Sequence, residues 1–120
     1  MKIRIESFGR KYGTPQADIV IDVRCLENPF WVEELRHMSG LDAPVKEYIF
    51  SNAQSVDYVQ KLTQLLLAQA LLAQGRQCRE LHIAVGCTGG RHRSVAVAEY
   101  LAQNLGDYEI EVCHTDIGKG

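Results

Sequence analysis

The residues of this chain with the clearest chemical potential stand together in one short segment, Gly86-Cys87-Thr88-Gly89-Gly90-Arg91-His92-Arg93-Ser94. An apolar run precedes this segment and a helical pattern follows it at once. Glycines let successive backbone N–H groups turn inward, and a helix N-terminus adds unpaired donors and a partial positive charge. Arginine adds a planar fork that matches phosphate oxygens. We therefore predict that residues 87–94 bind a phosphate or a similar anion. A tight turn with solvated arginines is the alternative.

The spacing of Cys87 and Arg93 suggests a second interpretation. Because the two residues are six apart and Ser94 follows, the segment has the Cys-x5-Arg-Ser spacing of phosphate-binding loops in cysteine phosphatases. A thiol at a helix start beside arginines can act as a nucleophile, although a small residue also suits a tight loop. Such enzymes typically carry His before the Cys, where this chain has Gly86, and no recognisable partner loop supplies an acidic Asp. We expect a binding loop without catalysis, and a phosphatase with Cys87 as nucleophile is the alternative.

Polar residues at the end of another predicted strand are candidates for the rest of the site. Asp22, Arg24 and Asn28 follow the β-branched run of residues 19–23. Because ligands of parallel sheets bind at the carboxyl ends of strands, these side chains are expected near the mouth of the loop. For Asp22 the alternative is a local structural role, in which its carboxylate orients Arg24 or a loop arginine. Phe30 and Trp31 either form the floor of a pocket or belong to the core.

Basic residues near both segments suggest a nucleic-acid ligand as a further hypothesis. Arg10, Lys11 and Arg91 can together contact the phosphates of RNA. The net charge of −2 argues against a strong nonspecific nucleic-acid binder. RNA binding through these three residues would weaken as salt rises.

The elements that must position these residues form an α/β pattern. Strands are predicted over residues 3–8, 19–23, 81–85 and 108–113, long helices over 55–74 and 95–105, and a short helix over 45–50. Residues 12–15 are expected as a turn, 29–35 as a short helix or turn, and 38–44 as a loop. The run at 19–23 predicts a strand buried on both faces. This order predicts a small, mostly parallel sheet covered by helices, with a phosphate-binding strand-loop-helix unit.

Length and composition indicate one domain over residues 1–120, long enough for a core without disulfides. No apolar run is long enough to span a bilayer, and the start of the chain lacks a signal-peptide core, so we expect a cytoplasmic protein. The four cysteines and four histidines are scattered, so neither a metal site nor a cofactor is predicted.

Four motifs, in this order, resemble one known family. The first is Ser7-Phe8-Gly9-Arg10-Lys11-Tyr12-Gly13, and the second is Asp22-Val23-Arg24-Cys25-Leu26 with Asn28-Pro29. The third is Glu34-Leu35-Arg36 with Met38-Ser39-Gly40-Leu41-Asp42 and Pro44-Val45, and the fourth runs from Ile83 to Val95 through the glycine-rich loop. Together they resemble the C-terminal domain of the RapZ (YvcJ-like) RNase adapter family over nearly the whole chain.

The resemblance implies a domain that binds the aminosugar phosphate glucosamine-6-phosphate and, in some bacteria, small regulatory RNAs and an endoribonuclease. It also implies homo-oligomers. Full-length members begin with a nucleotide-binding domain whose Walker A motif, Gly-x4-Gly-Lys-Ser/Thr, is absent here, so nucleotide hydrolysis is not expected of this chain. We therefore expect a non-catalytic sugar-phosphate sensing domain. Residues 87–94 would hold the phosphate, and Asp22, Arg24 and Asn28 would contact the rest of the ligand.

Overall fold

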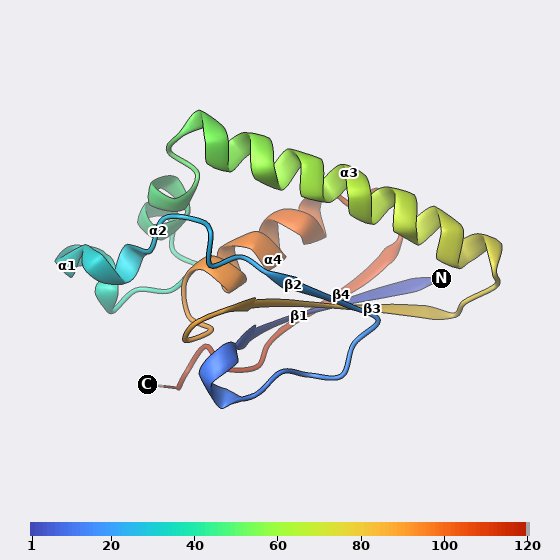
Figure 1. Cartoon of the computed structure of the whole chain (residues 1–120), viewed down its shortest axis with the longest axis horizontal. Helices are drawn as coiled ribbons and strands as arrows, with labels where there is room; N and C mark the ends of the chain where they lie inside the picture. The colour runs from blue at the N-terminus through green and yellow to red at the C-terminus, as the bar shows by residue number, and fades with distance from the viewer. Residues whose placement is uncertain (120) are drawn as a thin grey trace.

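The computed structural model describes residues 1–119, in which four parallel strands form one sheet beneath a layer of helices (Figure 1). The strands are β1 (Lys2–Gly9), β2 (Ile19–Asp22), β3 (Glu80–Cys87) and β4 (Glu109–His114). Their order across the sheet is β2-β3-β1-β4, so β1 pairs with β3 on one side and β4 on the other. The predicted α/β class with a small parallel sheet is confirmed.

The helical segments connect these strands and cover the sheet. They are the 3-10 turns η1 (Arg10–Tyr12) and η2 (Pro29–Trp31) and the α-helices α1 (Glu33–Arg36), α2 (Ala43–Ile49), α3 (Ala53–Gly75) and α4 (Arg93–Asn104). α3 begins where the Asn52 side chain accepts a hydrogen bond from the Ser55 backbone N–H at 2.8 Å. Within residues 1–119 none of these helices combines the length and the apolar character that a membrane crossing requires.

Some predicted boundaries were wrong by a few residues. α2 begins at Ala43 and includes Pro44, for which the sequence pattern predicts a loop. Proline is tolerated in the first helical turn because its missing N–H would have no partner there. α4 begins at Arg93 rather than at residue 95, so Arg93 and Ser94 are helical.

The main core lies between the sheet and the helices. Ile3 and Ile5 of β1 face α4 and α3 and are fully buried, whereas Lys2 and Arg4 alternate onto the opposite face. The expectation that residues 19–23 form a strand buried on both faces was wrong. β2 is an edge strand, and Val20 remains 45% exposed on the face without helices.

The parallel arrangement brings four connecting segments to one edge of the sheet. η1 follows β1, the turn leading to η2 follows β2, the glycine-rich loop follows β3, and residues 115–119 follow β4. All four begin at carboxyl ends of strands, where open α/β sheets bind their ligands.

Candidate functional site

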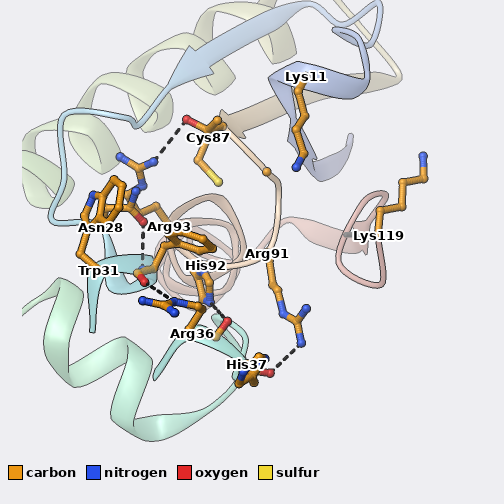
Figure 2. A pocket seen from close by; sticks show the side chains of 13 residues that line it. Lys11, Asn28, Trp31, Arg36, His37, Cys87, Arg91, His92, Arg93 and Lys119 are labelled. Atoms are coloured by element: carbon orange, nitrogen blue, oxygen red, sulfur yellow. Dashed lines mark hydrogen bonds between the residues drawn. The ribbon is translucent and has the colours of Figure 1, made fainter. Parts of the chain in front are cut away.

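A cavity of about 460 Å³ opens at this carboxyl edge of the sheet (Figure 2). Its volume is in the range of small-molecule sites. The glycine-rich loop forms one wall, η2 and the end of α1 form a second, and η1 and the C-terminal segment contribute a third. The lining residues are Lys11, Asn28, Phe30, Trp31, Arg36, His37, Cys87, Thr88, Gly89, Arg91, His92, Arg93 and Lys119.

Positive charge dominates this cation-lined pocket. Its lining contains five Lys or Arg side chains and two histidines, and among the described residues no Asp or Glu contributes to it. The chain as a whole carries a formal charge of −2. Cations have therefore been concentrated at one concave surface, where low-dielectric walls strengthen their field. Such a surface favours an anionic ligand.

The loop also presents unpaired backbone donors. The N–H groups of residues 89–93 make no hydrogen bond to any residue between 1 and 119, because they precede the first bonded turn of α4. Two of the loop carbonyls accept hydrogen bonds: Thr88 O accepts from Lys11 N–H at 3.2 Å and Arg91 O accepts from Gly40 N–H at 2.9 Å. The loop is thus fixed by its acceptors while its donors stay available to an anion.

Gly90 allows the loop to pack against the end of β1. Its φ of +77° lies in the left-handed region, and a Cβ there would stand 2.5 Å from Gly9 N. Just behind this contact the buried Asp116 carboxylate accepts a hydrogen bond from Gly9 N–H at 2.7 Å and pairs with Lys119 at 2.7 Å. Burial alone would raise the pKa of Asp116, but these two partners outweigh it and lower the pKa. Asp116 therefore stays charged and anchors the C-terminal segment beneath the loop.

Backbone carbonyls hold the arginines of the pocket. Arg93, only 6% exposed, donates from Nη1 to Arg24 O at 2.8 Å, with Leu26 O at 3.4 Å. Arg91 donates from Nη2 to His37 O at 2.6 Å. Arg36 donates from Nε to Phe30 O at 2.9 Å. Each guanidinium is oriented by a neutral partner and keeps further N–H groups for a ligand.

Cys87 and His92 lie at the two ends of the loop. Cys87 is buried at the cavity wall, and its Sγ donates to Ser94 Oγ at 3.1 Å. Burial lowers the pKa of His92, although hydrogen bonding to Arg36 O and neighbouring carbonyls partly opposes this effect. Because Arg36 O can only accept, Nε2 of the neutral ring carries the proton of their 3.2 Å hydrogen bond. His92 therefore holds the α1 end against the loop.

Asp22 and Arg24 do not line the cavity, in contrast to our expectation. Asp22 accepts hydrogen bonds from Arg24 Nη2 at 2.7 Å and from its backbone N–H at 3.0 Å, and Arg10 Nη1 lies 3.9 Å away. The Arg24 hydrogen bonds lower the pKa of Asp22 to about 2, so its carboxylate remains ionised. The carboxylate turns toward these partners because a local cation lies only two residues along the chain. Of the three predicted residues after β2, only Asn28 reaches the lining.

The remaining loop residues divide between lining and support. Thr88, Gly89, Arg91, His92 and Arg93 line the cavity together with Cys87. Gly90 and Ser94 lie behind it, against Gly9 and Cys87 respectively.

Three basic lining residues, Arg36, His37 and Lys119, were not predicted from the sequence. Lys119 follows β4, so the rule that parallel strands share a carboxyl edge would have placed it near the loop. Arg36 and His37 end the short helix α1, and no periodic pattern in the sequence places that helix beside the loop.

Comparison with known proteins shows a family match over nearly the whole chain. Residues 1–118 match the family model described as the RapZ C-terminal domain. The chain is 45% identical over 125 residues to a "Nucleotide-binding protein" of Rhodococcus erythropolis and 44% identical over 122 residues to one of Carboxydothermus hydrogenoformans. Each alignment covers 99% of this chain but 41% and 42% of the respective relative. The chain therefore spans about two fifths of the length of these curated relatives.

Proposed function

The chain belongs to the RapZ C-terminal domain family, and we propose that its cation-lined pocket binds a phosphate-bearing ligand without transforming it. The observation that carries this proposal is a lining with five Lys or Arg side chains and no carboxylate among the described residues. The unpaired N–H groups of residues 89–93 add donors at the same wall. A hydrogen bond to a charged group contributes about 1.5–3 kcal/mol, so a few such contacts support micromolar binding.

For the ligand we propose an aminosugar phosphate of the glucosamine-6-phosphate type. The phosphate would lie against residues 89–93 and Arg93, and the sugar would extend toward Asn28 and the end of α1. Asn28 Oδ1 accepts from Phe30 N–H at 3.1 Å, which orients the Asn28 amide and leaves its NH₂ group to donate to a hydroxyl. Asp22 acts indirectly in this arrangement, because it holds Arg24, whose carbonyl oxygen accepts from Arg93.

Calorimetric titration with glucosamine-6-phosphate, inorganic phosphate and glucosamine tests this proposal. We expect affinity to decrease in that order, with glucosamine showing no binding. Lys11→Ala should weaken the binding of both phosphate ligands severalfold. Lys11 lines the pocket and pairs with no carboxylate among residues 1–119, so its charge is available to the ligand. Its Nζ lies 5.2 Å from the centroid of the Tyr12 ring. Lys61→Ala is the matched control, since Lys61 pairs with Asp57 on α3. Equal affinity for phosphate and glucosamine-6-phosphate would contradict the aminosugar assignment.

A phosphatase with Cys87 as nucleophile is the second candidate function. It is favoured by the position of Cys87 at the cavity wall that also holds Arg93. Against it, no carboxylate in the described lining can protonate a leaving group, and the thiol is engaged with Ser94 Oγ. We expect no release of phosphate from an aryl phosphate between pH 5 and 7. Turnover that disappears in Cys87→Ser would favour the enzyme instead.

Binding of a small regulatory RNA is a finer proposal for the same face. Lys11 and Arg91 line the pocket, whereas Arg10 is drawn toward Asp22. RNA affinity should decrease as salt increases, and Lys11→Ala should reduce the salt slope by about one. An RNA affinity that is independent of salt would argue against this use of the pocket.

Association with an endoribonuclease and homo-oligomerisation stay predictions, which light scattering of the chain alone and with the enzyme would test.

A further inference from the structure

Beyond the glycine-rich loop, one edge of the pocket is aromatic. A phosphate bound to the loop would not explain this aromatic edge. Phe30 and Trp31 belong to the lining, and their side chains remain 46% and 75% exposed. Figure 2 shows Trp31 on the side of the pocket that also carries Asn28 and Arg36, opposite Lys11 and Lys119. Large aromatic side chains are normally well buried. Two adjacent exposed rings in the wall of an anion pocket therefore indicate a contact for part of the ligand.

Neighbouring side chains support this aromatic edge. Phe30 and Trp31 pack edge to face with ring centroids 5.4 Å apart. Asn28 caps the turn η2 through the Phe30 N–H, and Arg36 donates to the Phe30 carbonyl oxygen at 2.9 Å. The Arg36 guanidinium also lies 5.0 Å from the Phe30 ring centroid. Phe30 is thus supported by its neighbours, while the more exposed Trp31 ring is available to a ligand.

We propose that Trp31, supported by Phe30, is a stacking platform for an unpaired nucleobase whose phosphate lies on residues 89–93. This inference rests on the proposed phosphate site and adds a ring subsite to it. Sites for single-stranded nucleic acids combine cations that contact the backbone with aromatic rings on which bases stack. The pocket has this combination, because its lining includes Trp31 together with the cationic side chains of Arg36, Arg91 and Lys11. Its volume of about 460 Å³ leaves room beyond a phosphate group for a planar ring.

Trp31 is the only tryptophan of the chain, so its fluorescence reports directly on this subsite. Adenosine 5′-monophosphate should quench the emission, whereas ribose 5-phosphate and inorganic phosphate should leave it nearly unchanged. Calorimetry should show that adenosine 5′-monophosphate binds roughly fivefold to a hundredfold more tightly than ribose 5-phosphate, the range expected for one stacked base.

Substitutions separate stacking from phosphate binding. Trp31→Ala should remove most of the advantage of adenosine 5′-monophosphate while ribose 5-phosphate binds as before, and Trp31→Phe should keep part of it. Because Trp31 is highly exposed, neither change should unfold the protein. Leu72→Ala is the matched control, since Leu72 is 71% exposed on α3 and outside the lining. The affinity for a single-stranded oligoadenylate should be lower in Trp31→Ala than in the wild type, whereas the affinity for a duplex of equal length should be the same in both.

The outcomes distinguish this inference from the proposal on which it rests. If wild-type protein binds neither ribose 5-phosphate nor inorganic phosphate, the phosphate site itself is wrong. If it binds them but adenosine 5′-monophosphate binds no more tightly, the stacking platform alone is wrong. An equal loss for ribose 5-phosphate and adenosine 5′-monophosphate in Trp31→Ala would also overturn the platform, because the substitution would then act on the whole pocket.

Discussion

Arg93 illustrates how a single residue prepares the pocket for an anion. Its Nη1 donates to the carbonyl oxygen of Arg24, and a carbonyl carries no net charge, so the guanidinium keeps its full positive charge. A carboxylate partner would have oriented the side chain equally well but would have cancelled its field. Asp22 shows that contrast, because its carboxylate is committed to Arg24 outside the lining.

Arg93→Ala should affect both stability and binding. The change leaves the Arg24 carbonyl oxygen without its donor and opens space in a buried position, so the free energy of unfolding should decrease by about 1.5–3 kcal/mol. The affinity for glucosamine-6-phosphate should decrease about tenfold or more. Urea unfolding and calorimetry measure the two effects, with Arg79→Ala on exposed Arg79 as control. Unchanged ligand affinity in the folded variant would remove Arg93 from the binding site.

His92 predicts a pH dependence of stability. Its folded pKa lies below the ordinary value of 6.5 because burial disfavours the charged ring. As the pH decreases through 6.5, the unfolded chain takes up the proton more readily than the folded one, so the free energy of unfolding decreases. At about pH 8 both states are neutral and the effect vanishes.

This pH dependence can be measured by urea unfolding of the wild type and of His92→Gln. The two pH values are about 8 and about 5.5, on either side of the ordinary histidine pKa. The wild type should lose more stability than the variant over this interval, since Gln can donate to Arg36 O but does not titrate. All other side chains are the same in the two proteins, so the difference between their losses reports on His92 alone. Identical losses in the two proteins would show that His92 does not titrate differently on folding.

The loop between β3 and α4 depends on close packing of its backbone against the end of β1. Gly90→Ala would place a methyl group against Gly9 N and also strain the left-handed backbone. Gly106→Ala is a matched control, because Gly106 has a φ of +76° and a Cβ added to it would meet no atom within 4 Å. The control should cost about 1–2 kcal/mol of unfolding free energy for its conformation alone.

Gly90→Ala should cost clearly more than this control and should also weaken phosphate binding. The additional loss comes from displacing the loop from β1, which changes the direction of the N–H groups that follow. Urea unfolding and calorimetry on both variants provide the comparison. Equal destabilisation, with ligand affinity preserved in both, would mean that the loop yields to the methyl group without cost.

The sequence predicts an element well where its pattern specifies local structure, and poorly where the outcome depends on neighbouring elements. The strand, glycine cluster and helical period around residues 81–105 specify their own local structure, so the strand-loop-helix unit was correctly predicted. The burial of β2 was not correctly predicted, because a run of β-branched residues does not reveal whether a neighbouring strand or helix covers it. The direction of the Asp22 side chain was not predicted for a related reason. The end of a strand indicates where the backbone lies, but the carboxylate turns toward the nearest positive charge.

The whole molecule carries its main core on one side of the sheet, and α3 illustrates the result. Leu66 is 1% exposed, whereas its neighbour Leu65 is 58% exposed. Leu66→Ala should reduce the free energy of unfolding by about 2–5 kcal/mol, since it leaves a cavity in the core. Leu65→Ala should change it by about 0.5 kcal/mol or less. The midpoints of urea unfolding measure both, and similar costs would contradict the position of α3 on the sheet.

The position of β1 between β3 and β4 has a consequence for how the chain folds. β1 is the first of the four strands to be synthesised, yet its two neighbours begin only at Glu80 and Glu109. Ribosomes add about 5–20 residues per second, so β1 waits several seconds with both backbone edges unpaired. Pairings between such distant segments also form slowly, because a long loop must close first. Lys2 and Arg4, whose charges discourage intermolecular strand pairing, are suitably placed to protect β1 from aggregation during that interval.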